Sequence, residues 1–167
     1  LGSPAPRNLI DFQKRFNVRV IDGYGSTEMG MVLWKNPEDH RDKSMGYPTE
    51  GFYVELRNPE NIGEIIRPHW DPYTDPNPPD SAKGILYIRP LVPNTTLNEY
   101  FKDERRTREA FDDDAFFNSD DIMACGTDGR YYFVGTVRTY SDNTAGTIDY
   151  TTGKVIINSI NITTVSN

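Results

Sequence analysis

Residues 18–28 read Val18-Arg19-Val20-Ile21-Asp22-Gly23-Tyr24-Gly25-Ser26-Thr27-Glu28, and the predicted fold rests on them. The first four residues have the composition of a short strand. Two glycines around Tyr24 then predict a sharp turn with unusual backbone angles. Upstream, apolar side chains recur at helical spacing after a proline, which predicts a helix over residues 4–16. Helix, strand and glycine turn are typical of an α/β layer, in which ligands lie beyond the carboxyl ends of strands.

The pattern after Gly30 is richer in strands. Apolar runs at 52–57 and 84–89 predict two strands, and five prolines within residues 68–79 predict a loop between them. Residues 97–111 predict a charged helix or helix pair. Two hairpins are predicted, one at 121–134 around an Asp-Gly pair and one at 147–157. We therefore predict a mixed α/β chain with a β-hairpin tail.

Composition excludes several classes of protein. No apolar run reaches the length of about 18 residues that a membrane span needs. The net charge of −7 argues against a nucleic-acid binder. The single cysteine, Cys125, excludes an internal disulfide, and the two histidines, His40 and His69, are too few for a histidine metal cage. The chain begins at Leu1 with no secretory signal, so we expect a fragment and a cytoplasmic location.

The stretch from Tyr24 to Glu28 has the chemistry of a nucleotide site. A threonine hydroxyl such as that of Thr27 can donate to a phosphate oxygen. A carboxylate such as that of Glu28 can hold Mg²⁺, which takes one or two carboxylates together with phosphate oxygens and waters. The ring of Tyr24 can stack on a base. The alternative is a plain glycine turn with a helix cap at Ser26 or Thr27.

A second candidate site is the run Phe117-Asn118-Ser119-Asp120-Asp121-Ile122. A carboxylate at a strand start can accept hydrogen bonds from two ribose hydroxyls, although an acidic solvated turn explains the same residues. Asp112-Asp113-Asp114 lacks the spacing of a calcium loop. We interpret His69 as a packing or surface residue and Cys125 as a small core residue.

In order along the chain, these segments resemble the adenylate-forming acyl-CoA synthetases, also called AMP-dependent synthetases and ligases. Tyr24-Gly25-Ser26-Thr27-Glu28 matches the Tyr-Gly-x-Thr-Glu motif of that family, and Asp121 falls on the aspartate of its Thr-Gly-Asp motif. The resemblance runs from Leu1 to about Arg138. Five further segments resemble family motifs: Gly2-Ser3-Pro4-Ala5-Pro6, Ser44-Met45-Gly46-Tyr47-Pro48, Gly84-Ile85-Leu86-Tyr87-Ile88-Arg89-Pro90, Asn98-Glu99-Tyr100-Phe101 with Thr107 and Phe111, and Asp128-Gly129-Arg130-Tyr131-Tyr132-Phe133-Val134-Gly135.

The resemblance implies a ligase that forms an acyl-adenylate from a carboxylic acid and ATP and passes the acyl group to coenzyme A. It implies the end of an α/β subdomain followed by a barrel-like β subdomain, as residues 1–138 of a partial large AMP-binding domain. By position, Thr27 and Glu28 would be catalytic, with Glu28 holding Mg²⁺. The implied nucleotide-binding residues are Gly2, Ser3, Tyr24, Gly25, Ser26 and Asp121.

The departures from the family pattern predict an inactive chain. Asp120 replaces a glycine, and Thr136-Val137-Arg138-Thr139 stands where the family has an arginine followed by Lys-Asp. The phosphate loop and the C-terminal domain with the catalytic lysine are absent, so we expect pyrophosphate exchange at background. Residues 139–167 form a β-rich tail that resembles a segment of phage baseplate wedge proteins. A structural virion module and a non-catalytic nucleotide-binding remnant are therefore the alternatives, and the acid and the oligomeric state stay open.

Overall fold

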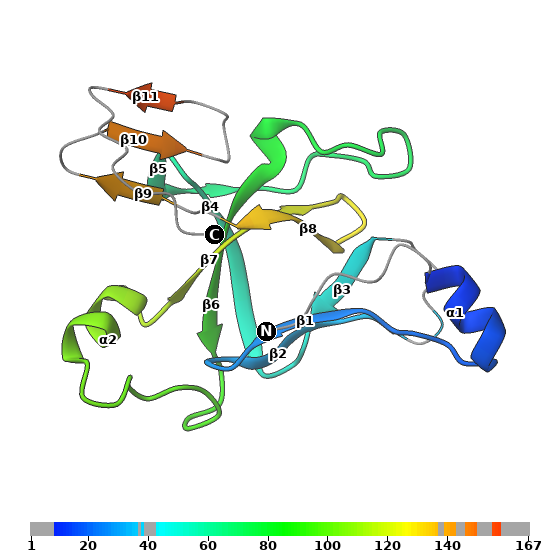
Figure 1. The fold of residues 1–167 in the computed structure, drawn as a ribbon, viewed down its shortest axis with the longest axis horizontal. Helices are drawn as coiled ribbons and strands as arrows, with labels where there is room; N and C mark the ends of the chain where they lie inside the picture. Colours follow the sequence, from blue (N-terminus) through cyan, green and yellow to red (C-terminus); the bar gives the residue numbers. More distant parts are fainter. Residues whose placement is uncertain are drawn as a thin grey trace, which may run out of the picture.

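The computed structural model describes residues 9–36, 38, 43–136, 139–142, 146–149 and 155–157, with side chains described for 11–36, 38 and 43–136. The described chain is mostly antiparallel β-sheet, as Figure 1 shows. Two short α-helices, α1 (Leu9–Phe16) and α2 (Glu104–Ala110), lie at opposite ends of the molecule. Neither they nor any other helix of the described residues is long and apolar enough to cross a membrane.

One eight-stranded sheet holds most of the chain in the order β1-β2-β3-β8-β7-β6-β4-β5. All neighbouring pairs are antiparallel. The strands are β1 (Gly23–Ser26), β2 (Gly30–Trp34), β3 (Ser44–Pro48), β4 (Phe52–Asn58), β5 (Asn61–Ile66), β6 (Lys83–Pro90), β7 (Phe117–Cys125) and β8 (Tyr131–Thr136). A short 3₁₀ helix (Asp80–Ala82) precedes β6.

The strand β6 lies between β4 and β7 and is buried on both faces. Successive side chains of a strand point to opposite faces. Leu86 and Ile88 therefore join the main core, whereas Ile85 and Tyr87 pack in a smaller cluster on the other face. The main core also takes in Met29, Val32, Leu33, Val54, Leu56, Phe117, Met123 and Cys125. The apolar run at 84–89 is thus a central strand, as predicted.

The sheet curls strongly along its length. Three strands separate β1 from β7 in the sheet order, yet the side chains of Tyr24 on β1 and Asp121 on β7 are hydrogen-bonded. Figure 1 shows the hairpin of β1 and β2 lying across the direction of β6. The curl brings the N-terminal hairpin over the middle of the sheet.

The described structure corrects the α/β prediction near the N-terminus. Helix α1 forms within the predicted range, but the predicted strand at 18–21 is wrong. Val18 N–H donates to the backbone oxygen of Gln13, and Val20 N–H donates to the Gln13 side chain, so these donors face α1 instead of a partner strand. Val18 and Val20 are also exposed, so no apolar face drives sheet packing.

Two further predictions need correction. The residues predicted as a sharp turn around Tyr24 form strand β1, and the chain reverses afterwards at 27–29. The helix predicted over 97–111 is confined to α2. Lys102 has a positive φ of 55°, so a helix cannot continue through this residue. The Asp103 side chain caps the N-terminus of α2 by accepting a hydrogen bond from Arg106 N–H.

Other predictions are confirmed. Strands β4 and β6 and the proline-rich loop between them lie where the sequence predicts them, and β7 and β8 pair around the turn at Asp128-Gly129. In the tail, β9 (Thr139–Asp142), β10 (Gly146–Asp149) and β11 (Val155–Ile157) form a separate antiparallel sheet that contains the predicted hairpin. The resemblance of this tail to a phage baseplate segment stays a prediction.

Candidate functional site

The hairpin of β1 and β2 presents the Tyr24-to-Glu28 segment at its tip. Strand β1 has a bulge between Tyr24 and Gly25. A Cβ atom at Gly25 would lie 2.0 Å from the backbone oxygen of Gly30, so only glycine permits this approach. The hydroxyl of Ser26 accepts a 3.2 Å hydrogen bond from Met29 N–H and closes the turn. The alternative of a helix cap at Ser26 is therefore replaced by a hairpin turn.

Tyr24 and Asp121 meet across the curled sheet. The Tyr24 hydroxyl donates to Asp121 Oδ2 at 2.6 Å, between residues 97 positions apart in the sequence. A distance this short is typical of a hydroxyl that donates to a charged carboxylate. The two residues that the sequence assigns to base and ribose are thus in direct contact.

Two residues besides Tyr24 hold Asp121 directly. Its Oδ1 accepts a 2.8 Å hydrogen bond from the Thr136 hydroxyl on β8. Its backbone N–H donates to Ser119 Oγ at 3.1 Å, and Ser119 Oγ in turn donates to the backbone oxygen of Leu86 at 2.8 Å. Both carboxylate oxygens of Asp121 therefore accept hydrogen bonds from side-chain hydroxyls.

Burial and charge perturb the titration of this cluster. Burial raises the pKa of Tyr24 well above its usual value, and the hydrogen bond to Asp121 and the Asp121 charge raise it further. The phenol therefore stays protonated and remains a donor. Burial and the Asp121 charge raise the pKa of Asp120. Asp120 also has a positive φ of 56°, at the position where the family motif carries glycine.

Glu28 is held from a different part of the chain. The Tyr100 hydroxyl donates to Glu28 Oε1 at 3.1 Å, and Leu97 N–H donates to the backbone oxygen of Glu28 at 2.7 Å. Burial raises the pKa of Tyr100, and the hydrogen bond to Glu28 adds to the effect. Glu28 is half-buried.

The donor set around Glu28 fits a cation that a nucleotide carries. No group of three or more His, Cys, Asp or Glu side chains suited to a metal occurs among the residues described. A metal held entirely by protein ligands therefore does not fit these residues. Mg²⁺ bound to phosphates needs only one or two carboxylates, and Glu28 can supply one.

Three predicted site residues remain, namely Thr27, Gly2 and Ser3. Thr27 lies exposed next to Glu28 in the turn. Gly2 and Ser3 lie outside the described residues. Tyr100 and Thr136 are contacts of the site that the sequence did not predict. Thr136 stands at a departure from the family pattern. Neither position carries a local signal, because both contacts depend on the curl of the sheet.

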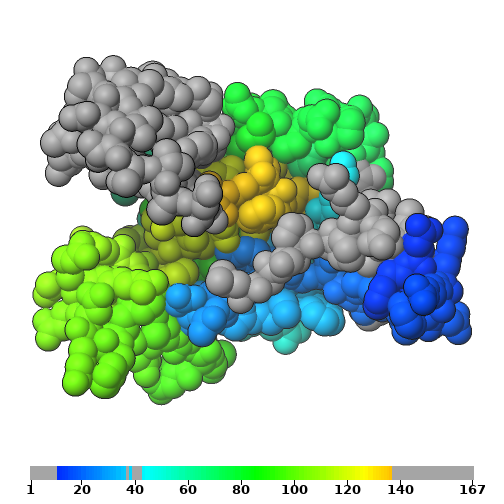
Figure 2. All heavy atoms as spheres, viewed as in Figure 1, coloured from blue at the N-terminus to red at the C-terminus, as the bar shows by residue number. Residues whose placement is uncertain are grey.

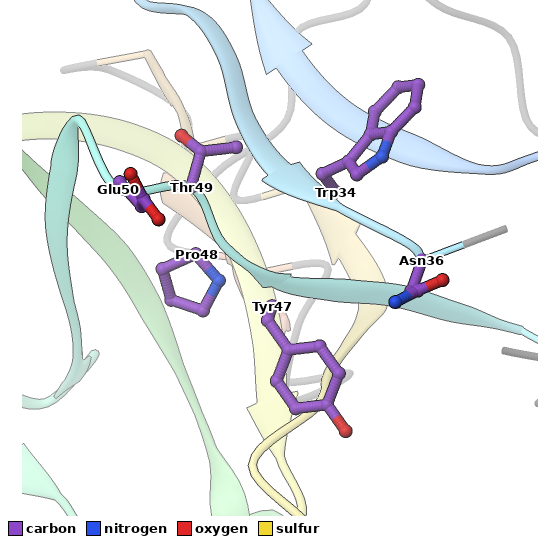
Figure 3. Close-up of a pocket in the computed structure, with 6 residues that line it drawn as sticks. All are labelled: Trp34, Asn36, Tyr47, Pro48, Thr49 and Glu50. Atoms are coloured by element: carbon purple, nitrogen blue, oxygen red, sulfur yellow. The ribbon is translucent and has the colours of Figure 1, made fainter. Parts of the chain in front are cut away.

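A shallow depression lies away from this cluster. It has a volume of about 370 Å³ and is open to solvent, and Figure 3 shows the side chains that line it. Its lining residues are Trp34, Asn36, Tyr47, Pro48, Thr49 and Glu50. None of the residues predicted for the site lines it, and the rings of Trp34 and Tyr47 point away from each other. The depression therefore does not gather the chemistry of the candidate site.

The structure agrees with the interpretation of His69 as a packing or surface residue and of Cys125 as a small core residue. His69 is exposed, and its ring contacts the Arg67 backbone oxygen and the Ser81 hydroxyl, both at 3.0 Å. Cys125 is buried in the core, and burial raises the pKa of its thiol to about 11. Asp112 pairs with Arg57 at 2.6 Å instead of joining a calcium loop.

Comparison of the sequence with known proteins gives a consistent set of relatives. No protein-family model matches the chain. The acyl–CoA ligase YtcI of Bacillus subtilis, an uncharacterised protein, is 35% identical over 123 residues, which are 71% of this chain and 20% of that protein. Crotonobetaine/carnitine–CoA ligase of Salmonella typhimurium is 26% identical over 126 residues, which are 74% of this chain and 22% of the ligase. The chain thus spans about a fifth of the length of these relatives.

Solved structures show the same fold. The luciferase-like enzyme of the mealworm Zophobas morio matches 81% of this chain and 30% of its own with a TM-score of 0.63 and 24% identity. O-succinylbenzoate coenzyme A synthetase of Bacillus subtilis, solved with AMP, matches 81% of this chain and 25% of its own with a TM-score of 0.60 and 18% identity. The same synthetase has been solved with ATP and magnesium. The relatives of this chain, and several of its structural neighbours, are therefore acyl-CoA ligases of the AMP-dependent family.

Proposed function

We propose that this chain is part of an ATP-dependent carboxylate–CoA ligase, which activates a carboxylic acid as an acyl-adenylate before transfer to coenzyme A. The observation that supports the proposal is the contact between Tyr24 and Asp121, two residues 97 positions apart that the family resemblance assigns to one nucleotide site. The names of the relatives support the same activity. In this proposal, residues 1–138 belong to the large AMP-binding domain and residues 139–167 form a separate β-rich tail.

Each residue of the site has a distinct task in this proposal. The Tyr24 ring stacks on adenine, and Asp121 accepts hydrogen bonds from the ribose hydroxyls. Thr27 donates to the phosphate of the adenylate. Gly25 and Ser26 shape the turn that the nucleotide approaches, and Gly2 and Ser3 lie against adenine.

Glu28 supplies a carboxylate to Mg²⁺, and the cation, when bound, neutralises phosphate charge during attack by the acid. Catalysis of this kind depends on positioning and charge and needs no general base among these residues. That requirement agrees with the small number of histidines in the chain.

The chain by itself forms no acyl-adenylate in this proposal. Thr136 stands where the family has an arginine, and its hydroxyl is bonded to Asp121. The resemblance assigns that arginine to binding of the ribose, and a threonine hydroxyl cannot supply its charge or its planar set of donors. We expect the chain to bind AMP without turnover and to show pyrophosphate exchange at background with any carboxylate, and robust exchange would contradict this point.

Binding of AMP by the full chain tests the proposal. We expect AMP to perturb the amide signals around Asp121 in a two-dimensional NMR titration. Asp121→Asn should weaken binding at least about tenfold, because hydrogen bonds to charged groups contribute about 1.5–3 kcal/mol. Asp113→Asn is the matched control, because Asp113 is an exposed residue outside the site.

The ligand offers a second control. 2′,3′-Dideoxy-AMP lacks both ribose hydroxyls, so it should bind as weakly to the wild-type chain as to the Asp121→Asn variant. Equal affinity of the wild-type chain for AMP and the dideoxy analogue, or no AMP binding at all, would refute the proposed role of Asp121.

A further inference from the structure

The segment from Leu97 to α2 forms two hydrogen bonds with Glu28. Leu97 N–H donates to the backbone oxygen of Glu28 at 2.7 Å, and the Tyr100 hydroxyl donates to Glu28 Oε1 at 3.1 Å. The second contact joins residues 72 positions apart. One contact fixes the backbone of the hairpin tip and the other fixes the side chain.

Tyr100 is itself held in place by the start of α2. Its backbone N–H donates to Thr107 Oγ1 at 2.9 Å, and the Thr107 hydroxyl donates to the Asp103 backbone oxygen at 2.9 Å. The Arg106 guanidinium lies 4.0 Å from the centre of the Tyr100 ring. These contacts fix the ring from its backbone and from one face, so the hydroxyl reaches Glu28 in a defined direction.

A phenol has one proton to donate, and its hydrogen bond occupies one carboxylate oxygen. The bond to Oε1 restrains rotation of the Glu28 carboxylate. The other oxygen, Oε2, accepts no hydrogen bond and forms no ion pair within the described part of the chain. The arrangement therefore leaves a defined oxygen for a ligand.

We propose that Tyr100 is a positioning residue that holds Glu28 so that Oε2 faces a divalent cation carried by a nucleotide polyphosphate. The inference rests on the proposed function, since it assumes that the site takes a nucleotide. Tyr100 does not touch the cation or the nucleotide in this arrangement and acts through Glu28. The segment that contains α2, yellow-green in Figure 2, thereby supports a site formed by a hairpin that is distant from it in the sequence.

Binding of Mn²⁺ to the full chain tests the inference, with electron paramagnetic resonance as the readout and α,β-methylene-ATP at saturation. Tyr100→Phe keeps the ring against Arg106 and removes only the hydroxyl. We expect it to weaken Mn²⁺ binding about three- to tenfold, the range that one hydrogen bond contributes. Glu28→Gln should weaken it more, and Tyr100→Phe should add nothing to Glu28→Gln. Tyr53→Phe, at a tyrosine 45% exposed on β4, is the matched control and should leave binding unchanged.

A double-mutant cycle measured without metal tests the contact between Tyr100 and Glu28 by itself. The unfolding equilibrium of Tyr100→Phe, Glu28→Gln and the double variant in urea should show a coupling of about threefold or more. Independent effects of the two substitutions would overturn the inference. Wild-type affinity for Mn²⁺ in Tyr100→Phe, with binding lost in Glu28→Gln, would overturn the role of Tyr100 and leave the proposed function intact. Failure of the wild-type chain to bind Mn²⁺ with the nucleotide would instead refute the proposed function together with this role.

Discussion

Removal of the Tyr24 hydroxyl should destabilise the chain by about 1.5 kcal/mol. The Tyr24→Phe variant keeps the ring, which packs against the main core, and loses only the 2.6 Å hydrogen bond to Asp121. Hydrogen bonds to charged groups contribute about 1.5–3 kcal/mol. The lower value applies because Asp121 is half-buried, keeps its bond to Thr136 and can regain water at Oδ2.

Urea unfolding followed by circular dichroism measures this loss. A change of about 1.5 kcal/mol corresponds to roughly a tenfold change in the unfolding equilibrium. Tyr53→Phe, on an exposed tyrosine of β4, controls for the loss of a hydroxyl elsewhere and should change stability by less than about 0.5 kcal/mol. If the two variants unfold at the same urea concentration with the same slope, the contact between β1 and β7 does not hold the curl of the sheet.

The pH dependence of stability gives an independent check. The pKa of Tyr24 is higher in the folded chain than the usual value near 10, because burial and Asp121 favour the neutral phenol. The stability that this residue contributes is therefore fully present below pH 10 and is lost as the pH rises through the folded pKa. The wild-type chain should lose stability more steeply above pH 10 than Tyr24→Phe, and parallel profiles would contradict this reasoning.

Three further predictions follow from other parts of the fold. Arg57→Ala should lower the free energy of unfolding in urea by about 3 kcal/mol, because it leaves Glu55, which is 8% exposed, without its cation. Arg105→Ala removes an ion pair in which the arginine is 77% exposed, so it should lower the free energy of unfolding by less than about 0.5 kcal/mol. Equal losses in the two variants would contradict the difference expected between a buried and an exposed ion pair. Asp120→Gly should raise the free energy of unfolding by about 0.5–1 kcal/mol, since its φ of 56° favours glycine and the like charge beside Asp121 is removed; Asp113→Gly, where φ is not positive, should lower it. Cys125 should react with a maleimide only when urea unfolds the chain, because it is buried and its thiol pKa is about 11; rapid labelling of the native chain would contradict its place in the core.

Elements with a strong local signal are predictable from the sequence. The turn at Asp128-Gly129 is one, because Gly129 has the positive φ of 79° that an Asp-Gly hairpin turn uses. The apolar run of β6 is another, because only a strand buried on both faces carries so continuous a run. In both cases the residues themselves impose the conformation.

Features that depend on distant partners are not predictable in this way. Residues 18–21 have the composition of a strand, but a strand forms only where a neighbour offers hydrogen bonds, and Gln13 takes two of the donors instead. The residue types at Tyr24, Glu28 and Asp121 indicate a nucleotide site. Their mutual arrangement, and the contacts of Tyr100 and Thr136, follow from the curl of the sheet, which no short stretch of sequence encodes.

The curl of the sheet also determines when the contacts of Tyr24 and Glu28 can form during synthesis of the chain. Tyr24 leaves the ribosome 97 residues before Asp121, and Glu28 leaves it 72 residues before Tyr100. Closing loops of this length costs conformational entropy, and contacts between distant residues slow folding. The contact of Tyr24 with Asp121 therefore waits for β7 to be made, and it forms only when the eight-stranded sheet is nearly complete.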